Sequence, residues 1–119
     1  MDDQPHITPL EALELLKEGN RRFLADEPYE PHADRSSRLR MLAAQRPIAA
    51  YLSCSDSRVA PELLFGRGLG ELFIIRNAGN SLCSTAIGSL EFAVSALQVP
   101  LVVVMGHENC GAVRAAVSV

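Results

Sequence analysis

Two short segments of the sequence combine sulfur, imidazole, carboxylate and guanidinium groups. The first segment, residues 54–58, reads CSDSR and places Cys54, Asp56 and Arg58 at alternate positions. If the segment stays extended, these three side chains lie on one side, because successive residues of a strand point to opposite faces. A thiolate is a nucleophile and a metal ligand, and an arginine fork fixes the orientation of a carboxylate. The segment therefore carries the groups of a metal-binding or nucleophilic site.

The second segment, residues 107–111, reads HENCG and supplies a histidine and a cysteine. In a helical turn, His107 and Cys110 lie three residues apart and face the same way. Each residue alone has an ordinary structural explanation, such as a small buried thiol or a histidine that bonds to backbone groups. Two cysteines and one histidine together form the donor set of a catalytic zinc site whose fourth position is open. The joint pattern therefore predicts a zinc site at Cys54, His107 and Cys110.

Asp56 has two possible roles in such a site. It is the obvious fourth ligand of a closed site. Alternatively, Arg58 holds it by a charge-assisted fork, and it accepts a hydrogen bond that orients a hydroxide on the metal. The sequence leaves both roles open.

The elements around these segments predict an α/β fold with a parallel sheet core flanked by helices. Short apolar runs at 48–53, 72–76 and 101–105 alternate with helical patterns at 61–65, 84–98 and from about Asn109 onward. The run 101–105 is continuously apolar, which predicts a central strand covered on both faces. Both chemical segments follow strands, so a 2-1-3 strand order would bring them together at the carboxyl edge of the sheet.

The first 46 residues predict an N-terminal helical arm ahead of a zinc-bearing core at 47–119, within a single domain spanning 1–119. Thr8 and Glu11 form a capping box, and an apolar stripe continues toward Leu24, although Gly19 weakens or ends it. A proline-containing loop and a second helix at 36–45 complete the arm. The thin sheet and the apolar last helix lead us to expect a partner chain or a domain that is truncated at its C-terminus.

Composition limits the class of protein. The chain has 119 residues, of which 48% are hydrophobic and 21% charged, and its formal net charge is −3. These values argue against a disordered chain, a membrane span and a nucleic-acid partner. The acidic, proline-containing N-terminus lacks the features of a secretory signal, so we expect a cytoplasmic protein. Of three cysteines, Cys83 is expected to be a buried or incidental thiol.

The segments CSDSR and HENCG resemble the two signature motifs of the β-class carbonic anhydrases. Residues 71–80 are similar to the second strand and following loop of that family, and residues 89–94 and 104–107 are similar to its helix and third strand. The resembled proteins continue past residue 119 with a further strand and helices.

The resemblance implies a zinc enzyme that reversibly hydrates carbon dioxide to bicarbonate and a proton through hydroxide on the metal. It implies zinc ligands at Cys54, His107 and Cys110, and a catalytic dyad of Asp56 and Arg58. It further implies substrate contacts at Gln45, Phe73 and Phe92. Because two thiolates donate more electron density to zinc than imidazoles do, we expect activity to favour alkaline pH.

The family likeness also implies a homodimer or higher homo-oligomer, with part of the pocket wall supplied by the partner subunit. Two other functions remain open at this stage. One is a relative that hydrolyses carbon disulfide or a similar molecule. The other is a non-catalytic, zinc-stabilised association module, which would bind zinc without turnover.

Overall fold

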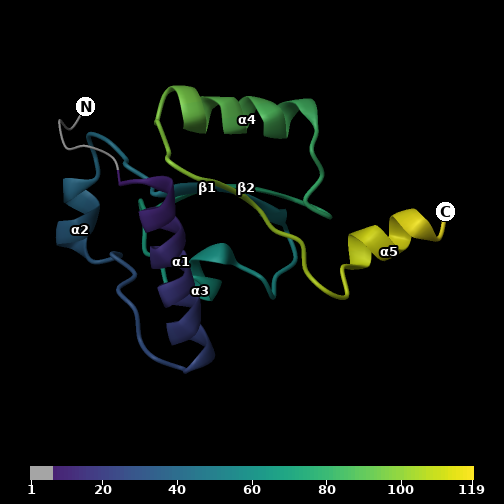
Figure 1. Ribbon diagram of the computed structural model, residues 1–119, viewed down its shortest axis with the longest axis horizontal. Coiled ribbons are helices and arrows are strands. Elements are labelled where there is room, and N and C mark those ends of the chain that lie inside the picture. The colour runs from purple at the N-terminus through teal and green to yellow at the C-terminus, as the bar shows by residue number, and fades with distance from the viewer. Residues whose placement is uncertain (1–6) are drawn as a thin grey trace.

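The computed structural model describes residues 7–119, which form three parallel strands and five helices (Figure 1). The strands are β1 (Ala49–Cys54), β2 (Leu72–Asn77) and β3 (Val102–Val104), in the order β2-β1-β3. This confirms the predicted parallel sheet with a 2-1-3 order, flanked by helices and preceded by a helical arm. The segment Met1–Pro5, on which the argument against a secretory signal depends, lies outside the described residues.

Strand β1 is the central strand, and all six of its residues are buried. It pairs with β2 from Ala49–Leu72 to Cys54–Asn77, and with β3 from Ala50 to Leu52. The prediction that the run 101–105 is the central strand is therefore wrong. Within residues 7–119, β3 has a neighbouring strand on one side only, and the side chain of Val104 is 65% exposed.

Helix α1 (Pro9–Leu24) begins as the sequence predicts, because Thr8 and Glu11 exchange side-chain to backbone hydrogen bonds of 3.0 and 3.1 Å. It passes through Gly19 without a break. A Cβ atom at Gly19 would lie 1.6 Å from the carbonyl oxygen of Phe65, just after α3 (Pro61–Leu64). The absent side chain therefore allows the two helices to pack closely. Of the two predicted effects of this glycine, ending the helix is wrong, and weakening it stays a prediction.

Helices α2 (Arg35–Arg40) and α4 (Ser84–Ser95) are both shorter than predicted. The side chain of Leu42 is 79% exposed, so residues 41–45 bury no apolar face that would stabilise another turn of α2. Helix α4 ends before Gln98, whose φ of 54° lies in the left-handed region. Helix α5 (Gly111–Val117) begins two residues later than predicted and buries none of its residues.

The sheet separates two apolar clusters. Leu16 of α1 packs with Ala49 and Tyr51 on one face, and Ala93 of α4 packs with Ala50 on the other. Helices α1 and α4 thus cover opposite faces of the sheet, whereas α5 extends away from it (Figure 1). No helix within residues 7–119 is long and apolar enough to cross a membrane. The division of the chain at residue 47 remains a prediction.

Candidate metal centre

Three side chains that are distant in sequence meet at the carboxyl edge of the sheet. Cys54 is the last residue of β1, and His107 and Cys110 lie in the loop between β3 and α5. One ligand atom from each residue lies within 4.8 Å of the others, and the two sulfur atoms are 3.8 Å apart. The structure therefore brings together the three residues that the sequence predicts as a donor set.

The local conformations differ from those that the sequence analysis assumed. The segment after Cys54 does not stay extended, because the Val59 N–H donates to the Asp56 carbonyl and closes a turn. Asp56 and Arg58 meet across this turn, where the Arg58 N–H donates to Asp56 Oδ1 at 2.9 Å. The second segment is a turn rather than a helix, with Asn109 at a φ of 56°. Turns replace the predicted strand and helix, yet the same side chains converge.

The donor geometry fits zinc. Tetrahedral zinc with Zn–S bonds of about 2.3 Å would hold two sulfur atoms about 3.8 Å apart, and Cys54 Sγ and Cys110 Sγ are separated by 3.8 Å. His107 Nδ1 lies 2.9 Å from the Glu108 carbonyl oxygen. Donation of Nδ1–H to that oxygen would leave a lone pair on Nε2, which is the arrangement of a metal-binding histidine.

A second observation concerns the same histidine nitrogen. His107 Nε2 is buried and has no hydrogen-bond partner among residues 7–119. Buried polar atoms rarely stay unpaired, so an orphaned imidazole nitrogen requires an explanation. A metal ion shared with Cys54 and Cys110 provides one.

Arg58 holds the Asp56 carboxylate by two parallel contacts. Arg58 Nε donates to Oδ1 at 2.9 Å, and Nη2 donates to Oδ2 at 2.6 Å. These hydrogen bonds hold the pKa of the Asp56 carboxyl well below its usual range, so the group is ionised at neutral pH. Oδ2 lies 3.8 Å from His107 Nε2. An oriented negative charge therefore stands beside the donor set.

The sulfur of Cys54 also receives a hydrogen bond from a third loop. The Gly79 N–H donates to Sγ at 3.3 Å. This bond is the main cause that lowers the pKa of the Cys54 thiol to about 6, and Asp56 and His107 act in the same direction. Gly79 has a φ of 78°, a conformation that glycine adopts without strain. The sequence alone did not point to Gly79, whose only signal was its position in the turn after the second predicted strand.

Arg76 was also missed as a residue that supports the site. It lies on β2 opposite Ser53. Its Nε donates to the Cys54 carbonyl at 2.8 Å, and its Nη2 donates to the Asp56 carbonyl at 2.6 Å. The side chain thus fixes the backbone on both sides of Ser55. Only the strand register reveals this role, and no local sequence pattern encodes that register.

The three predicted substrate contacts do not join this group within one chain. Gln45 is exposed in the loop before β1, at the opposite end of the strand from Cys54. Phe73 pairs with Ala50, four residues before Cys54, which corresponds to about 13 Å along a strand. The Phe73 ring lies 5.8 Å from that of Phe92 on α4.

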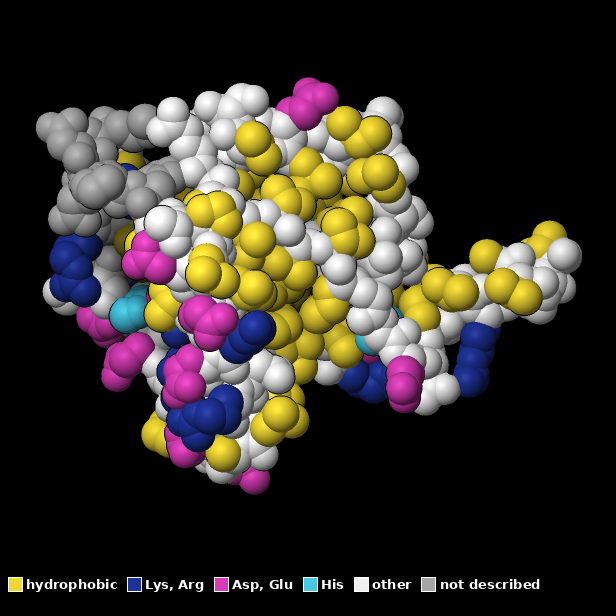
Figure 2. Space-filling view, viewed as in Figure 1, with side chains coloured by type: hydrophobic (Ala, Val, Ile, Leu, Met, Phe, Trp, Pro, Cys, Tyr) yellow, Lys and Arg dark blue, Asp and Glu magenta, His cyan; other side chains and the backbone are white. Residues whose placement is uncertain are grey.

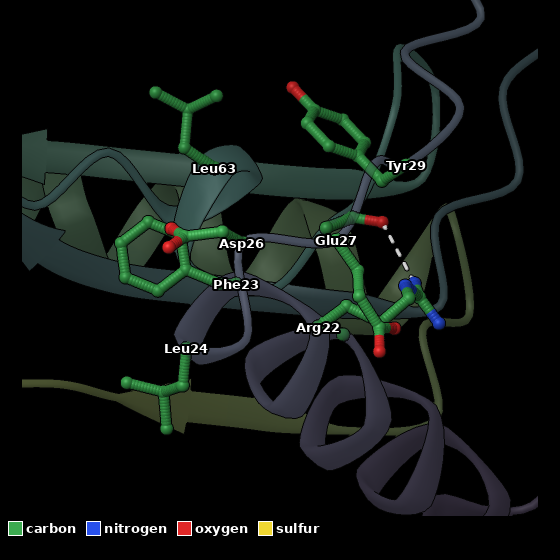
Figure 3. Close-up of a pocket in the computed structure, with 9 residues that line it drawn as sticks. Arg22, Phe23, Leu24, Asp26, Glu27, Tyr29 and Leu63 are labelled. Atoms are coloured by element: carbon green, nitrogen blue, oxygen red, sulfur yellow. Dashed lines mark hydrogen bonds between the residues drawn. The ribbon is translucent and has the colours of Figure 1, made fainter.

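A separate cavity of about 500 Å³ lies where α1 ends, and Phe23 and Leu63 line it (Figure 3). Its lining residues include none of the donor residues. Arg22, on the same wall, directs Nη2 at the Gly66 carbonyl. The cavity is thus distinct from the candidate metal centre.

The fold and the site define an α/β protein with a parallel sheet, which carries a candidate metal centre of Cys₂His type and an Asp–Arg pair at its carboxyl edge. Residues 49–119 match the family model described as carbonic anhydrase. The chain belongs to the β-carbonic anhydrase family, as the two sequence motifs indicated.

Similar proteins support this assignment along most of the chain. Carbonic anhydrase 2 of Mycobacterium tuberculosis is 46% identical over 114 residues, which cover 96% of this chain and 55% of the relative. The structure of the β-carbonic anhydrase CcaA matches with a TM-score of 0.66 and 30% identity, covering 92% of this chain and 51% of that one.

A structure of a tetrameric β-carbonic anhydrase from Sordaria macrospora matches with a TM-score of 0.66 and 26% identity. It covers 92% of this chain and 55% of the other. The chain thus spans about half the length of the curated relatives it matches.

Proposed function

We propose that this protein is a zinc-dependent carbonic anhydrase that interconverts carbon dioxide and bicarbonate. The observation that carries the proposal is the meeting of Cys54, His107 and Cys110 within 4.8 Å, beside the ionised Asp56. The likeness to the carbonic anhydrase of M. tuberculosis supports this reaction over a non-catalytic association module. Nothing in the described site favours carbon disulfide as a substrate.

In this proposal, Cys54, His107 and Cys110 hold the zinc ion. Zinc bound there would lower the pKa of a water ligand and so supply a hydroxide nucleophile. We assign Asp56 the second of its two predicted roles, because Arg58 holds both of its carboxylate oxygens in one orientation. Asp56 Oδ2 accepts a hydrogen bond at the reaction centre and orients the attacking oxygen. The carboxylate stays ionised because Arg58 stabilises its negative charge.

The substrate pocket requires a second subunit. Gln45, Phe73 and Phe92 lie away from the donor atoms of their own chain, and carbon dioxide needs an apolar wall beside the metal. We assign these three residues to the site of a partner copy in a homodimer or higher homo-oligomer. The tetrameric relatives of S. macrospora support such an assembly. Cytoplasmic localisation remains a prediction.

Stopped-flow measurement of carbon dioxide hydration by the zinc-loaded chain at alkaline pH tests this function. We expect turnover that disappears in Cys54→Ser, together with loss of the bound zinc. Cys83→Ser is the matched control, because Cys83 is an exposed thiol outside the donor set, and it should retain both zinc and turnover. One zinc per chain without turnover would contradict the proposal and favour the association module.

A further inference from the structure

Two of the three thiols in this chain touch each other. Cys54 Sγ and Cys110 Sγ are 3.8 Å apart, although the residues are separated by 56 positions in the sequence. Their side chains are only 4% and 8% exposed. Cys83 precedes α4 and is exposed, so of the two expectations for it, a buried thiol is wrong and an incidental thiol stays a prediction. Loss of a metal ion from the donor set would leave Cys54 and Cys110 in contact and shielded from other thiols.

The two cysteines differ in how firmly the fold holds them. Cys54 ends the fully buried central strand, and Arg76 binds its carbonyl. Cys110 precedes α5, which buries none of its residues. A disulfide requires a sulfur separation of about 2.05 Å. Cys110 can cover the remaining distance by moving with its loop and α5, without displacing the buried clusters on either face of the sheet.

We propose that Cys54 and Cys110 form a reversible intramolecular disulfide when the metal is lost in the presence of a peroxide. The oxidised site excludes zinc until a dithiol reductant restores both thiols. The inference rests on the proposed function for the identity of the metal, whereas the thiol contact is independent of any catalytic activity. The site thus has a second state in which a covalent bond replaces the metal.

The oxidation balances with hydrogen peroxide as the oxidant. The Cys54 thiolate attacks one peroxide oxygen, the O–O bond breaks, and the departing hydroxide takes up a proton to become water. Cys110 then attacks the sulfur of the resulting sulfenic acid. The S–S bond forms, the S–O bond breaks, and hydroxide leaves as water with the proton of Cys110. Two thiols lose two electrons, and one peroxide is reduced to two molecules of water.

The test treats the full, zinc-loaded chain with hydrogen peroxide, with and without a chromophoric zinc chelator. We expect zinc release together with a mass decrease of two hydrogen atoms. Peptide mapping without reduction should give one linked pair, between the peptides of Cys54 and Cys110, with Cys83 as the remaining free thiol. The chelator should accelerate the linkage, because bound zinc occupies both sulfurs. Dithiothreitol followed by zinc should restore the original mass and metal content.

Two variants separate this state from oxidation of an unfolded chain. Cys83→Ser should form the same linked pair at the same rate, whereas Cys110→Ser should form no intramolecular link and should carry added oxygen on Cys54. A mixture of all three pairings in the wild-type chain would overturn the proposal, because it would show that the thiols pair from an unfolded state. Sulfinic acid at Cys54 without any linkage would overturn it as well.

The two proposals fail separately. Selective linkage in a chain that hydrates no carbon dioxide would support the disulfide and contradict the proposed function. Rapid carbon dioxide hydration in a chain that never forms the linkage would support the proposed function and contradict the disulfide.

Discussion

The Cys54 side chain and backbone are held by residues from three separate segments. Gly79 donates to its sulfur, Arg76 donates to its carbonyl, and Cys110 contacts its sulfur. The sequence predicted the donor residues because their types and their positions after strands point to zinc. It could not predict Gly79 or Arg76, because their contacts depend on the register between β1 and β2, which no local pattern records.

Removal of the Arg76 guanidinium should weaken zinc binding. In Arg76→Gln, the carbonyls of Cys54 and Asp56 lose their shared donor, so both side chains lose their fixed orientation. We expect zinc affinity to fall about 10- to 100-fold, the usual effect of removing an outer-shell partner. Competition with a chromophoric chelator measures this affinity. Arg38→Gln, on the exposed side of α2, is the control, and equal affinities in the two variants would refute the supporting role of Arg76.

Replacement of the Arg58 fork should reduce turnover without removing the metal. Lysine cannot reproduce the parallel contacts that Nε and Nη2 make to the two oxygens of Asp56. We expect Arg58→Lys to keep one zinc per chain and to lower the rate of carbon dioxide hydration about 10- to 100-fold. Stopped-flow rates and metal analysis on the same samples measure both quantities. An unchanged rate would show that the function of the Asp56 carboxylate does not depend on the two parallel contacts from Arg58.

The low pKa of the Cys54 thiol should be visible in the metal-free chain. The surroundings lower the pKa of this thiol from 9.0 to about 6. The Cys54 thiolate therefore stabilises the folded state fully above pH 9, and this stabilisation is lost as pH falls through about 6. The difference in thiolate ultraviolet absorbance between the wild type and Cys54→Ser reports the titration of this thiol. We expect that difference to have its midpoint near pH 6. A midpoint near the ordinary thiol value of 9.0 would contradict the role of the Gly79 hydrogen bond.

At the level of secondary structure elements, local signals succeeded where their cause is local. The Thr8–Glu11 capping box predicted the start of α1, and the hydrogen bonds are present. Helix α5 begins two residues after the predicted position, because Asn109 has a φ of 56° in the preceding turn. The turn after Cys54 was not predicted, because the alternating residue types there fit an extended segment as well. The run 101–105 was interpreted as a central strand from its apolar character alone, although apolar character does not record which strands are neighbours.

Two glycines in helices should respond to alanine in opposite directions. In Gly19→Ala, the new Cβ would collide with the Phe65 carbonyl. We expect a loss of at least about 1–3 kcal/mol in the free energy of unfolding, as for overpacked sites. In Gly88→Ala, nothing lies within 4 Å of the new Cβ. Because alanine has a higher helix propensity than glycine, the free energy of unfolding should rise by about 0.5–1 kcal/mol. Urea denaturation measures both, and equal effects would refute the close packing of α1 and α3.

At the scale of the whole molecule, one chain leaves apolar surface exposed and predicted substrate contacts apart. Figure 2 shows apolar side chains gathered on the face between α1 and α4, and along α5. Val102 and Val104 of β3 are 40% and 65% exposed. Such a surface is typical of an interface between subunits. Neither the sequence nor one copy of the fold therefore shows the assembly that we propose to complete the pocket.

A complementation experiment tests whether subunits share a site. Cys54→Ser removes a proposed zinc ligand, and Gln45→Ala removes a proposed substrate contact in the loop before β1. If Gln45 serves the partner's site, mixed oligomers contain complete sites. We expect co-refolded mixtures of the two variants to hydrate carbon dioxide well above either variant alone. Mixtures no more active than the separate variants would show that Gln45 acts within its own chain or not at all.

The most direct test of the metal centre is zinc X-ray absorption spectroscopy on the full chain, with its metal content determined in parallel. We predict one zinc per chain, with two sulfur ligands at about 2.3 Å and the remaining ligands nitrogen or oxygen at about 2.0–2.1 Å. Cys110→Ser should lose sulfur from the spectrum or lose the metal altogether. A zinc ion coordinated by nitrogen and oxygen alone, or a chain that binds no zinc, would contradict the assignment of Cys54, His107 and Cys110 as its ligands.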